Sequence, residues 1–123
     1  MDSMLSPDEI IRELIDFRHK LGQLNADIIK LGRLKSQAEH DYRLLKAKKI
    51  IILRNEKVPV TIISDLVKGD EEVAILKLDL DKCEVLYDVK RENIRGLRDV
   101  MSIYQSILNY LKLEIGGNLN IGG

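Results

Sequence analysis

The sequence has little of several features on which common folds and sites depend. It contains no Trp, one Phe and one Cys among 123 residues. A lone Cys83 excludes an intrachain disulfide, and the shortage of aromatic side chains argues against a compact aromatic-centred core. The N-terminal segment MDSMLSPDEI lacks the pattern of a signal peptide, in which basic residues precede a long apolar run. No apolar stretch of the sequence approaches the length of a bilayer span. We therefore expect a soluble, cytoplasmic protein that does not associate with membranes.

The chain also lacks an excess of either charge, with 20 basic and 20 acidic residues. This balance excludes a general attraction to nucleic acid or to an anionic membrane. The distribution is uneven, because residues 30–57 hold nine basic and three acidic residues whereas residues 70–92 hold eight acidic and four basic ones. A chain that folds back between these segments would lay opposite charges along a shared seam.

A first long helix is predicted over residues 7–54. Ser6, Pro7 and Glu9 form the pattern of a capping box with proline at the first helical position. Apolar residues then recur in steps of three and four, as in a coiled-coil seam. Gly22 and Gly32 interrupt this segment; we interpret both as points of close helix contact, with a break near Gly32 as the alternative. The seam consists of Ile10, Leu14, Phe17, Leu21, Leu24, Ile28 and Leu31.

A second long helix is predicted over residues 70–114, with Asp70 as its cap and acidic residues in its first turn. Its seam runs from Val73 to Leu111, and the part that we assign to an oligomer seam is Ile94, Leu97, Met101, Tyr104, Leu108 and Leu111. Further apolar residues widen the stripe beyond what one partner helix covers, so we expect this helix to meet at least two others. These are Leu86, Val89, Val100, Ile103 and Ile107.

The connector admits two interpretations. Its apolar spacing around Gly69 imitates a helix-turn-helix, but a recognition helix that begins with acidic residues would repel phosphates. We favour a short helix over residues 59–68, with Pro59 as its first residue and Gly69 as a left-handed cap. The basic block is the candidate nucleic-acid contact of the alternative, and it consists of Lys30, Arg33, Lys35, Arg43, Lys46, Lys48, Lys49, Arg54 and Lys57.

No constellation for catalysis, metal or cofactor binding is predicted. His19 and His40 lack the spacing of a zinc site, and Cys83 falls at a seam position that suits a buried, inert thiol. No glycine-rich phosphate loop is present. Lysines at seam positions are more informative, because a lysine there either pairs with an acid that fixes the register or reaches outward to solvent; we favour the second. They are Lys35, Lys49 and Lys90.

One resemblance adds to this pattern. The segments AEHDYRLLKAKKIIILR, VPVTIISDLVKGDEE and LYDVKRENIRGLRDVMSIYQSIL resemble small helical proteins of bacteriophages that infect Gram-positive bacteria. The resemblance covers about residues 38–110. It includes the pair Tyr42 and Arg43, the Val-Pro connector and Tyr87. It implies a helical fold and a phage context, and it supplies no site, since that family has no established activity.

The sequence thus predicts an all-α protein: a long antiparallel helical hairpin with a short helix at the connector, assembling into a coiled-coil-like helical bundle. Residues 1–115 form one helical domain and residues 116–123 a flexible Gly/Asn tail. The predicted function is a non-enzymatic interaction module, a homo-oligomer (dimer or higher) that binds a host or phage protein. The alternative is a nucleic-acid-binding accessory for recombination, replication or transcription.

Overall fold

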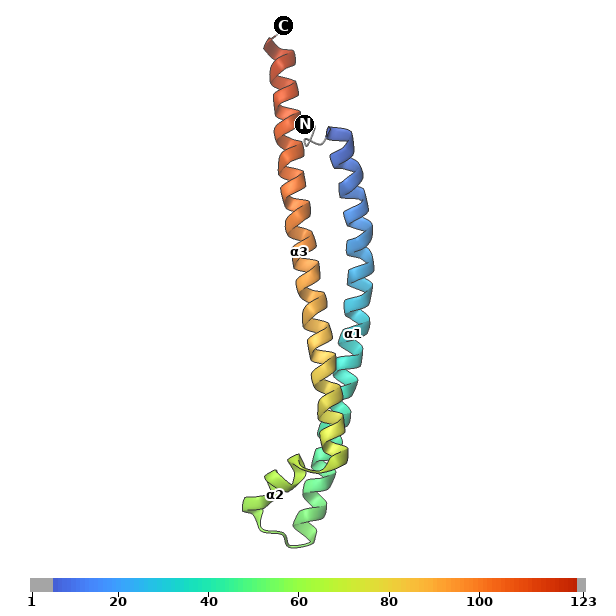
Figure 1. Cartoon of the computed structure of the whole chain (residues 1–123), viewed down its shortest axis with the longest axis vertical. Coiled ribbons are helices and arrows are strands. Elements are labelled where there is room, and N and C mark those ends of the chain that lie inside the picture. Colours follow the sequence, from blue (N-terminus) through green and yellow to red (C-terminus); the bar gives the residue numbers. More distant parts are fainter. Residues whose placement is uncertain (1–5, 122–123) are drawn as a thin grey trace. The chain divides into compact units, whose positions relative to one another are not determined.

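The computed structural model describes residues 6–121, with the backbone alone for residues 117–121. Three helices and no strand occur in this range (Figure 1). They are α1 (Pro7–Asn55), α2 (Val60–Lys68) and α3 (Glu71–Ile121). The all-helical class and the two long helices joined by a short one are therefore confirmed.

The start of α1 has the predicted capping box. The amide of Glu9 donates to the Ser6 hydroxyl oxygen at 3.2 Å, and the amide of Ser6 donates to the Glu9 carboxylate at 3.4 Å. The helix then continues without interruption through Gly32. A glycine weakens a helix by about 1 kcal/mol but leaves helical dihedrals open to it, so packing along the seam is sufficient to carry α1 through.

The end of α1 is a Schellman motif in which Lys57 takes the left-handed position, with φ 60°. The amide of Lys57 donates to the Arg54 carbonyl at 3.0 Å, and the amide of Val58 donates to the Leu53 carbonyl at 3.1 Å. This is the hydrogen-bond pair that defines the motif. The left-handed cap of the connector region thus lies at Lys57.

The prediction of a left-handed cap at Gly69 was wrong. Gly69 has φ −85° and ψ −5°, and its amide donates to the Asp65 carbonyl at 3.0 Å. Because α3 begins at Glu71, directly after this turn, the chain passes from α2 to α3 with right-handed geometry. Pro59 is also not the first helical residue: with ψ 132° it is the N-cap, and α2 starts at Val60.

The cap of α3 is as predicted, with the Asp70 carboxylate accepting from the Val73 amide at 3.1 Å. The far end differs from the prediction. The glycines after Glu114 were expected to end the helix there, but α3 continues to Ile121. No glycine in the described range has the positive φ of a helix-ending cap. The predicted flexibility of residues 116–123 remains a prediction, and residues 122–123 lie outside the described range.

The chain divides into two compact units. Unit 1 combines residues 1–27 with 90–123, and unit 2 is residues 28–89. In unit 1, α1 and α3 pack antiparallel: the rings of Phe17 and Tyr104 meet edge to face at 5.2 Å, and Lys90 lies 3.4 Å from Asp27. Among its described residues, the buried side chains are Ile10, Ile94 and Leu108.

Unit 2 contains α2 and the only cluster of buried side chains in the described residues. Ile63 and Val67 of α2 pack with Val73 of α3, and half-buried residues of α1 and the connector close around them. Each of the three is at most 5% exposed. The connector helix is therefore held by its own apolar face, as Figure 1 shows for α2 beside the last turns of α1. The surrounding residues are Tyr42, Leu45, Ile50, Leu53 and Val58.

Candidate functional site

The predicted oligomer seam lies against helices of the same chain. Each of its residues, from Ile10 to Leu31 on α1 and from Ile94 to Leu111 on α3, is buried or half-buried. Their periodicity therefore describes how α1 and α3 pack within each unit. Because a side chain already enclosed by its own chain has little surface left for another, the surface available to a partner lies elsewhere.

That surface is the second flank of α3, which the sequence predicted and which the described part of the chain does not cover. In unit 1, Val100 is 38% exposed, Ile103 58% and Ile107 44%. In unit 2, Leu86 is 55% exposed and Val89 52%. Tyr110 and Ile75 lie in the same row, at 66% and 54%. We call this row the outer stripe of α3. Stripes of exposed apolar side chains at helical spacing are typical of surfaces that bind another helix.

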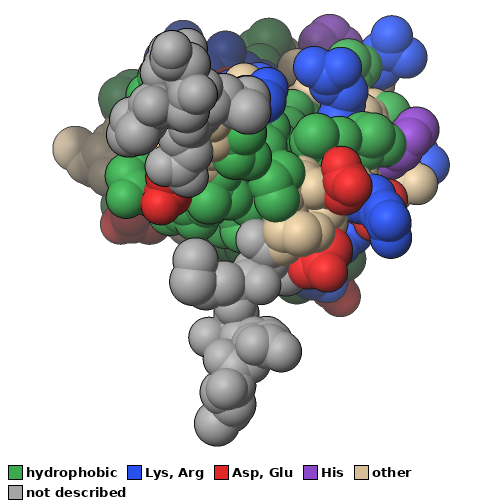
Figure 2. Space-filling model, turned by 90° about the horizontal axis from the view of Figure 1, so that it is seen from above, with side chains coloured by type: hydrophobic (Ala, Val, Ile, Leu, Met, Phe, Trp, Pro, Cys, Tyr) green, Lys and Arg blue, Asp and Glu red, His purple; other side chains and the backbone are tan. Residues whose placement is uncertain are grey.

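Exposed apolar residues on α1 were not predicted as a surface. Leu34 is 50% exposed, Leu44 46% and Ile51 57%. Leu34 directly precedes the seam position Lys35, and periodicity alone does not tell which of two neighbouring rows the facing helix covers. Their exposure adds a second apolar row within unit 2. Figure 2, which looks along the helices from above, shows hydrophobic side chains at the surface beside charged ones.

The three seam lysines find partners on the facing helix, so the favoured interpretation of lysines reaching only to solvent was wrong. Lys49 lies 3.4 Å from Asp70 and 3.6 Å from Glu72. Lys90 lies 3.4 Å from Asp27, and the ammonium of Lys35 lies 4.8 Å from the centre of the Tyr87 ring. Each contact joins α1 to α3 within one unit, so each favours the observed register.

The pair at the junction of α2 and α3 also shifts two pKa values. The Val73 amide, followed by Lys49, holds the pKa of Asp70 below its ordinary value of 3.8. In return the Asp70 carboxylate holds the pKa of Lys49 above 10.5. Both shifts favour the charged forms, so the ion pair persists across the physiological pH range.

Gly32 is a point of close helix contact, as predicted, whereas Gly22 is not. A Cβ atom at Gly32 would lie 3.5 Å from the Tyr87 ring, but nothing approaches within 4 Å of the same position at Gly22. The Tyr87 ring therefore rests on the bare backbone of α1 and under Lys35.

The basic block divides into two sets. Lys35, Lys46 and Lys49 are half-buried, and Lys46 lies 5.7 Å from the centre of the Tyr42 ring. Arg43 forms an ion pair with Glu39 one turn away, at 2.6 Å. The remaining residues are exposed and form no ion pair with the described part of the chain: Lys30, Arg33, Lys48, Arg54 and Lys57. The predicted nucleic-acid contact is thus partly engaged inside the fold.

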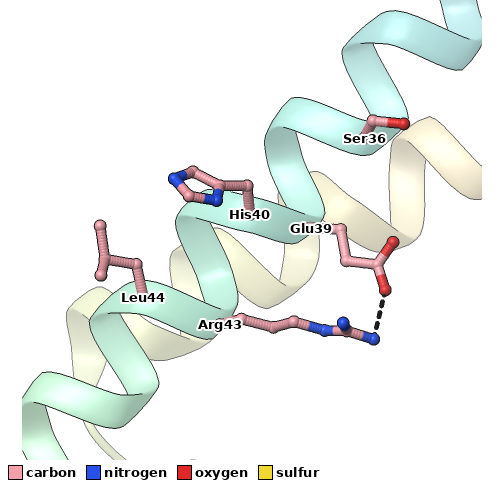
Figure 3. A pocket seen from close by; sticks show the side chains of 5 residues that line it. All are labelled: Ser36, Glu39, His40, Arg43 and Leu44. Atoms are coloured by element: carbon pink, nitrogen blue, oxygen red, sulfur yellow. Dashed lines mark ion pairs between the residues drawn. The ribbon is translucent and has the colours of Figure 1, made fainter.

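No depression in the described surface has the character of an active site. The one in Figure 3 is bordered by Ser36, Glu39, His40, Arg43 and Leu44, which all belong to α1. With no second element contributing, it is a shallow gap between side chains on one helix. A second depression, beside Tyr42, is bordered by an ion pair between Lys77 and Asp81 at 3.0 Å, a spacing that is common on helix surfaces.

His19 and His40 are exposed on α1, and Cys83 is half-buried on α3. Within the described range, no three His, Cys, Asp or Glu side chains come together as metal ligands would. The three described helices contain no stretch long and apolar enough to cross a membrane.

Comparisons with protein families, with curated proteins and with solved structures give no match.

Proposed function

We propose that this protein is a non-enzymatic interaction module whose chains associate with one another through apolar surface outside the α1–α3 seam. The observation that carries the proposal is the outer stripe of α3, whose Ile103, Leu86 and Val89 are all more than half exposed. Covering an apolar side chain fully contributes about 1.5–3 kcal/mol relative to leaving it in water. A row of several such residues therefore raises the free energy of a chain that leaves it exposed, and an assembly that covers the row lowers that free energy.

A bundle of helices from two or more chains is the simplest arrangement that covers such a row. In soluble helical proteins the flank of one helix is buried by a second neighbour at about 20° to it. The predicted assembly into a coiled-coil-like bundle would thus involve the flank, while the seam closes within each chain. The further proposal that the assembled protein binds a host or phage protein in the cytoplasm rests on the sequence resemblance.

Light scattering coupled to size-exclusion chromatography tests self-association. A single chain has a mass of 14.1 kDa. We expect the wild-type protein to elute with at least twice that mass, and the double variant Ile103→Gln/Ile107→Gln to shift towards one chain while keeping its helical circular dichroism. Ser102→Gln/Asn109→Gln is the matched control, because it places the same side chain at exposed polar positions of the same helix. A wild-type protein of single-chain mass at every concentration would contradict the proposal.

The alternative, nucleic-acid binding, is favoured by one observation, the five basic residues of the block that form no ion pair in the described structure. It predicts binding to single- or double-stranded DNA that weakens steeply with salt. The absence of a mobility shift at low salt would remove this alternative.

A further inference from the structure

The α1–α3 pair of unit 1 has two exposed sides. One side holds the residues that directly precede a seam position, and the other holds those that directly follow one. In two antiparallel helices that face each other, positions displaced in the same direction from the seam point to the same side of the pair. Unit 2 follows this rule, because Lys46 and Lys77, which each directly follow a seam leucine, both lie over the ring of Tyr42.

The first side of unit 1 is acidic on α1 and apolar on α3, and we call it the acidic side. Its α3 row is the unit 1 part of the outer stripe, from Val100 to Tyr110. Lys20 is its one basic residue in the described part of unit 1, and the Lys20 ammonium lies 5.8 Å from the centre of the Phe17 ring. The acidic residues of this side are all exposed: Glu9, Glu13, Asp16, Asp27 and, one step beyond Leu111, Glu114.

The opposite side reverses this division between the two helices, and we call it the basic side. Its α1 row carries Ile11 and Ile15, which are 40% and 52% exposed. Its α3 row carries exposed basic and uncharged polar residues. Asp8, which follows Pro7 one step before the seam, is the one acidic residue of this side in the described part of unit 1. The basic residues are Arg18, Arg91, Arg95, Arg98 and Lys112.

The other charged residues in the described part of unit 1 leave this division unchanged. Lys90 lies in the seam, where it pairs with Asp27 at 3.4 Å. The others belong to the outward rows, which point away from both sides: Arg12 on α1, and Glu92 and Asp99 on α3. Five acidic residues and one basic residue thus border one exposed apolar row, and five basic residues and one acidic residue border another on the opposite side.

We propose that the acidic side of unit 1 binds the basic side of unit 1 in a second copy of this chain, with α3 of the first copy over α1 of the second. This inference rests on the proposed self-association and names its two surfaces. The contact sets the outer stripe on Ile11 and Ile15, and the acidic row of α1 on the basic row of α3. A symmetric contact between two acidic sides or two basic sides would instead bring like charges together.

One register satisfies both rows of this contact. The facing helices are parallel in both pairs, so the same offset between α1 and α3 applies to each. When Val100 lies over Ile15, Glu13 lies opposite Arg98, and no two like charges of the described residues lie opposite each other. Because the contact joins two different surfaces, each copy keeps one free side after pairing, and further copies can add to form a chain or a closed ring.

Variants that alter one side test this pairing. Ile103→Gln/Ile107→Gln changes the acidic side, and Ile11→Gln/Ile15→Gln changes the basic side; all four isoleucines are exposed. Circular dichroism establishes that both variants keep their helices. In sedimentation velocity we expect each variant alone to have the mass of a single chain. An equal mixture should form complexes of two chains and none larger, because each variant keeps one intact side.

The matched control for both variants is His19→Gln/Ser106→Gln. It places the same side chain at exposed positions of the outward rows of the same two helices. This control should associate like the wild type.

A charge exchange tests the register. Glu13→Lys alone and Arg98→Glu alone should each weaken self-association at least about fivefold, because like charges then lie opposite each other. The double variant Glu13→Lys/Arg98→Glu should regain wild-type affinity, since its facing charges are opposite again. Asp99→Lys and Arg12→Glu make the same changes in net charge on the outward rows, and both should keep wild-type affinity.

The possible failures are distinct. If Ile11→Gln/Ile15→Gln associates like the wild type while Ile103→Gln/Ile107→Gln does not, the acidic side binds its own copy and the proposed pairing is wrong, while self-association stands. A mixture that stays at single-chain mass, or a double charge variant without recovery, also contradicts the pairing. If the wild type remains a single chain, the proposed function fails, and this inference fails with it.

Discussion

Unit 1 and the part of unit 2 around α2 show how a third helix changes the packing of the same two long helices. Around α2, Ile63, Val67 and Val73 are buried against one another. In unit 1 only α1 and α3 are present, and the buried residues Ile10, Ile94 and Leu108 belong to no such cluster. A pair of helices encloses only the side chains that point directly at the neighbour, whereas a third helix closes a core. In unit 1, where α1 and α3 pack on each other alone in the described structure, the flank of α3 with Val100, Ile103 and Ile107 stays exposed.

Within α2 we expect the largest difference in stability between substituting a buried residue and substituting an exposed one. Ile63 is 5% exposed and Ile62 is 45% exposed, and the two are neighbours of the same residue type. We expect Ile63→Ala to lower the free energy of unfolding by roughly 2–4 kcal/mol, through lost burial and a cavity. Ile62→Ala should change it by less than about 0.5 kcal/mol. Urea denaturation measures both; equal losses would mean that α2 does not dock as described.

The second comparison uses two glycines of α1. Gly32 faces Tyr87 at contact distance, and Gly22 faces open space. Gly22→Leu should stabilise the protein by about 0.5–1 kcal/mol through helix propensity. Gly32→Leu should destabilise it by roughly 1–3 kcal/mol, because the added side chain overpacks against the Tyr87 ring. If thermal unfolding shows both variants to be stabilised, the close approach of α1 and α3 at Gly32 is wrong.

A smaller effect on stability tests which residue of the connector region has left-handed backbone dihedrals. Lys57→Gly should raise the free energy of unfolding by about 0.5–1 kcal/mol, because a non-glycine residue is strained at positive φ. Gly69→Ala should also be tolerated or stabilising, by up to about 1 kcal/mol, since the backbone at Gly69 is right-handed. Guanidinium denaturation measures both. A clear destabilisation by Gly69→Ala would restore the left-handed cap that the sequence predicted.

The smallest effect concerns the ion pair at the start of α3. The raised pKa of Lys49 means that its contribution to stability is present below pH 10.5 and is lost as pH rises through the folded-state pKa. The lowered pKa of Asp70 means that its contribution is present above pH 3.8 and is lost as pH falls through its folded-state pKa. Thermal midpoints measured against pH should show a smaller alkaline loss in Lys49→Met than in the wild type. Lys46→Met, which removes a lysine held by a ring alone, should keep the wild-type profile.

More of the fold than of the candidate site could be predicted from the sequence. The steps of three and four, the capping box at Ser6 and the cap at Asp70 are local signals, so they predicted the helices and the seam row of each, but not whether the facing helix also covers the neighbouring row. Three features were missed, the left-handed Lys57, the continuation of α3 past Glu114 and the exposed row of Leu34. Each depends on backbone hydrogen bonds or on the position of the facing helix, and the residue types alone determine neither. Glycine was the misleading signal at Gly69, because it permits a left-handed turn without requiring one.

The most direct test of the central claim is the thermal unfolding midpoint of the wild-type protein, measured over a hundredfold range of concentration. A folded state that contains more than one chain is stabilised by mass action, so the midpoint should rise steadily with concentration, and Ile103→Gln/Ile107→Gln should flatten the rise. A midpoint that stays the same at every concentration would contradict the account, because it would mean that one chain alone is the folded unit despite its uncovered apolar rows.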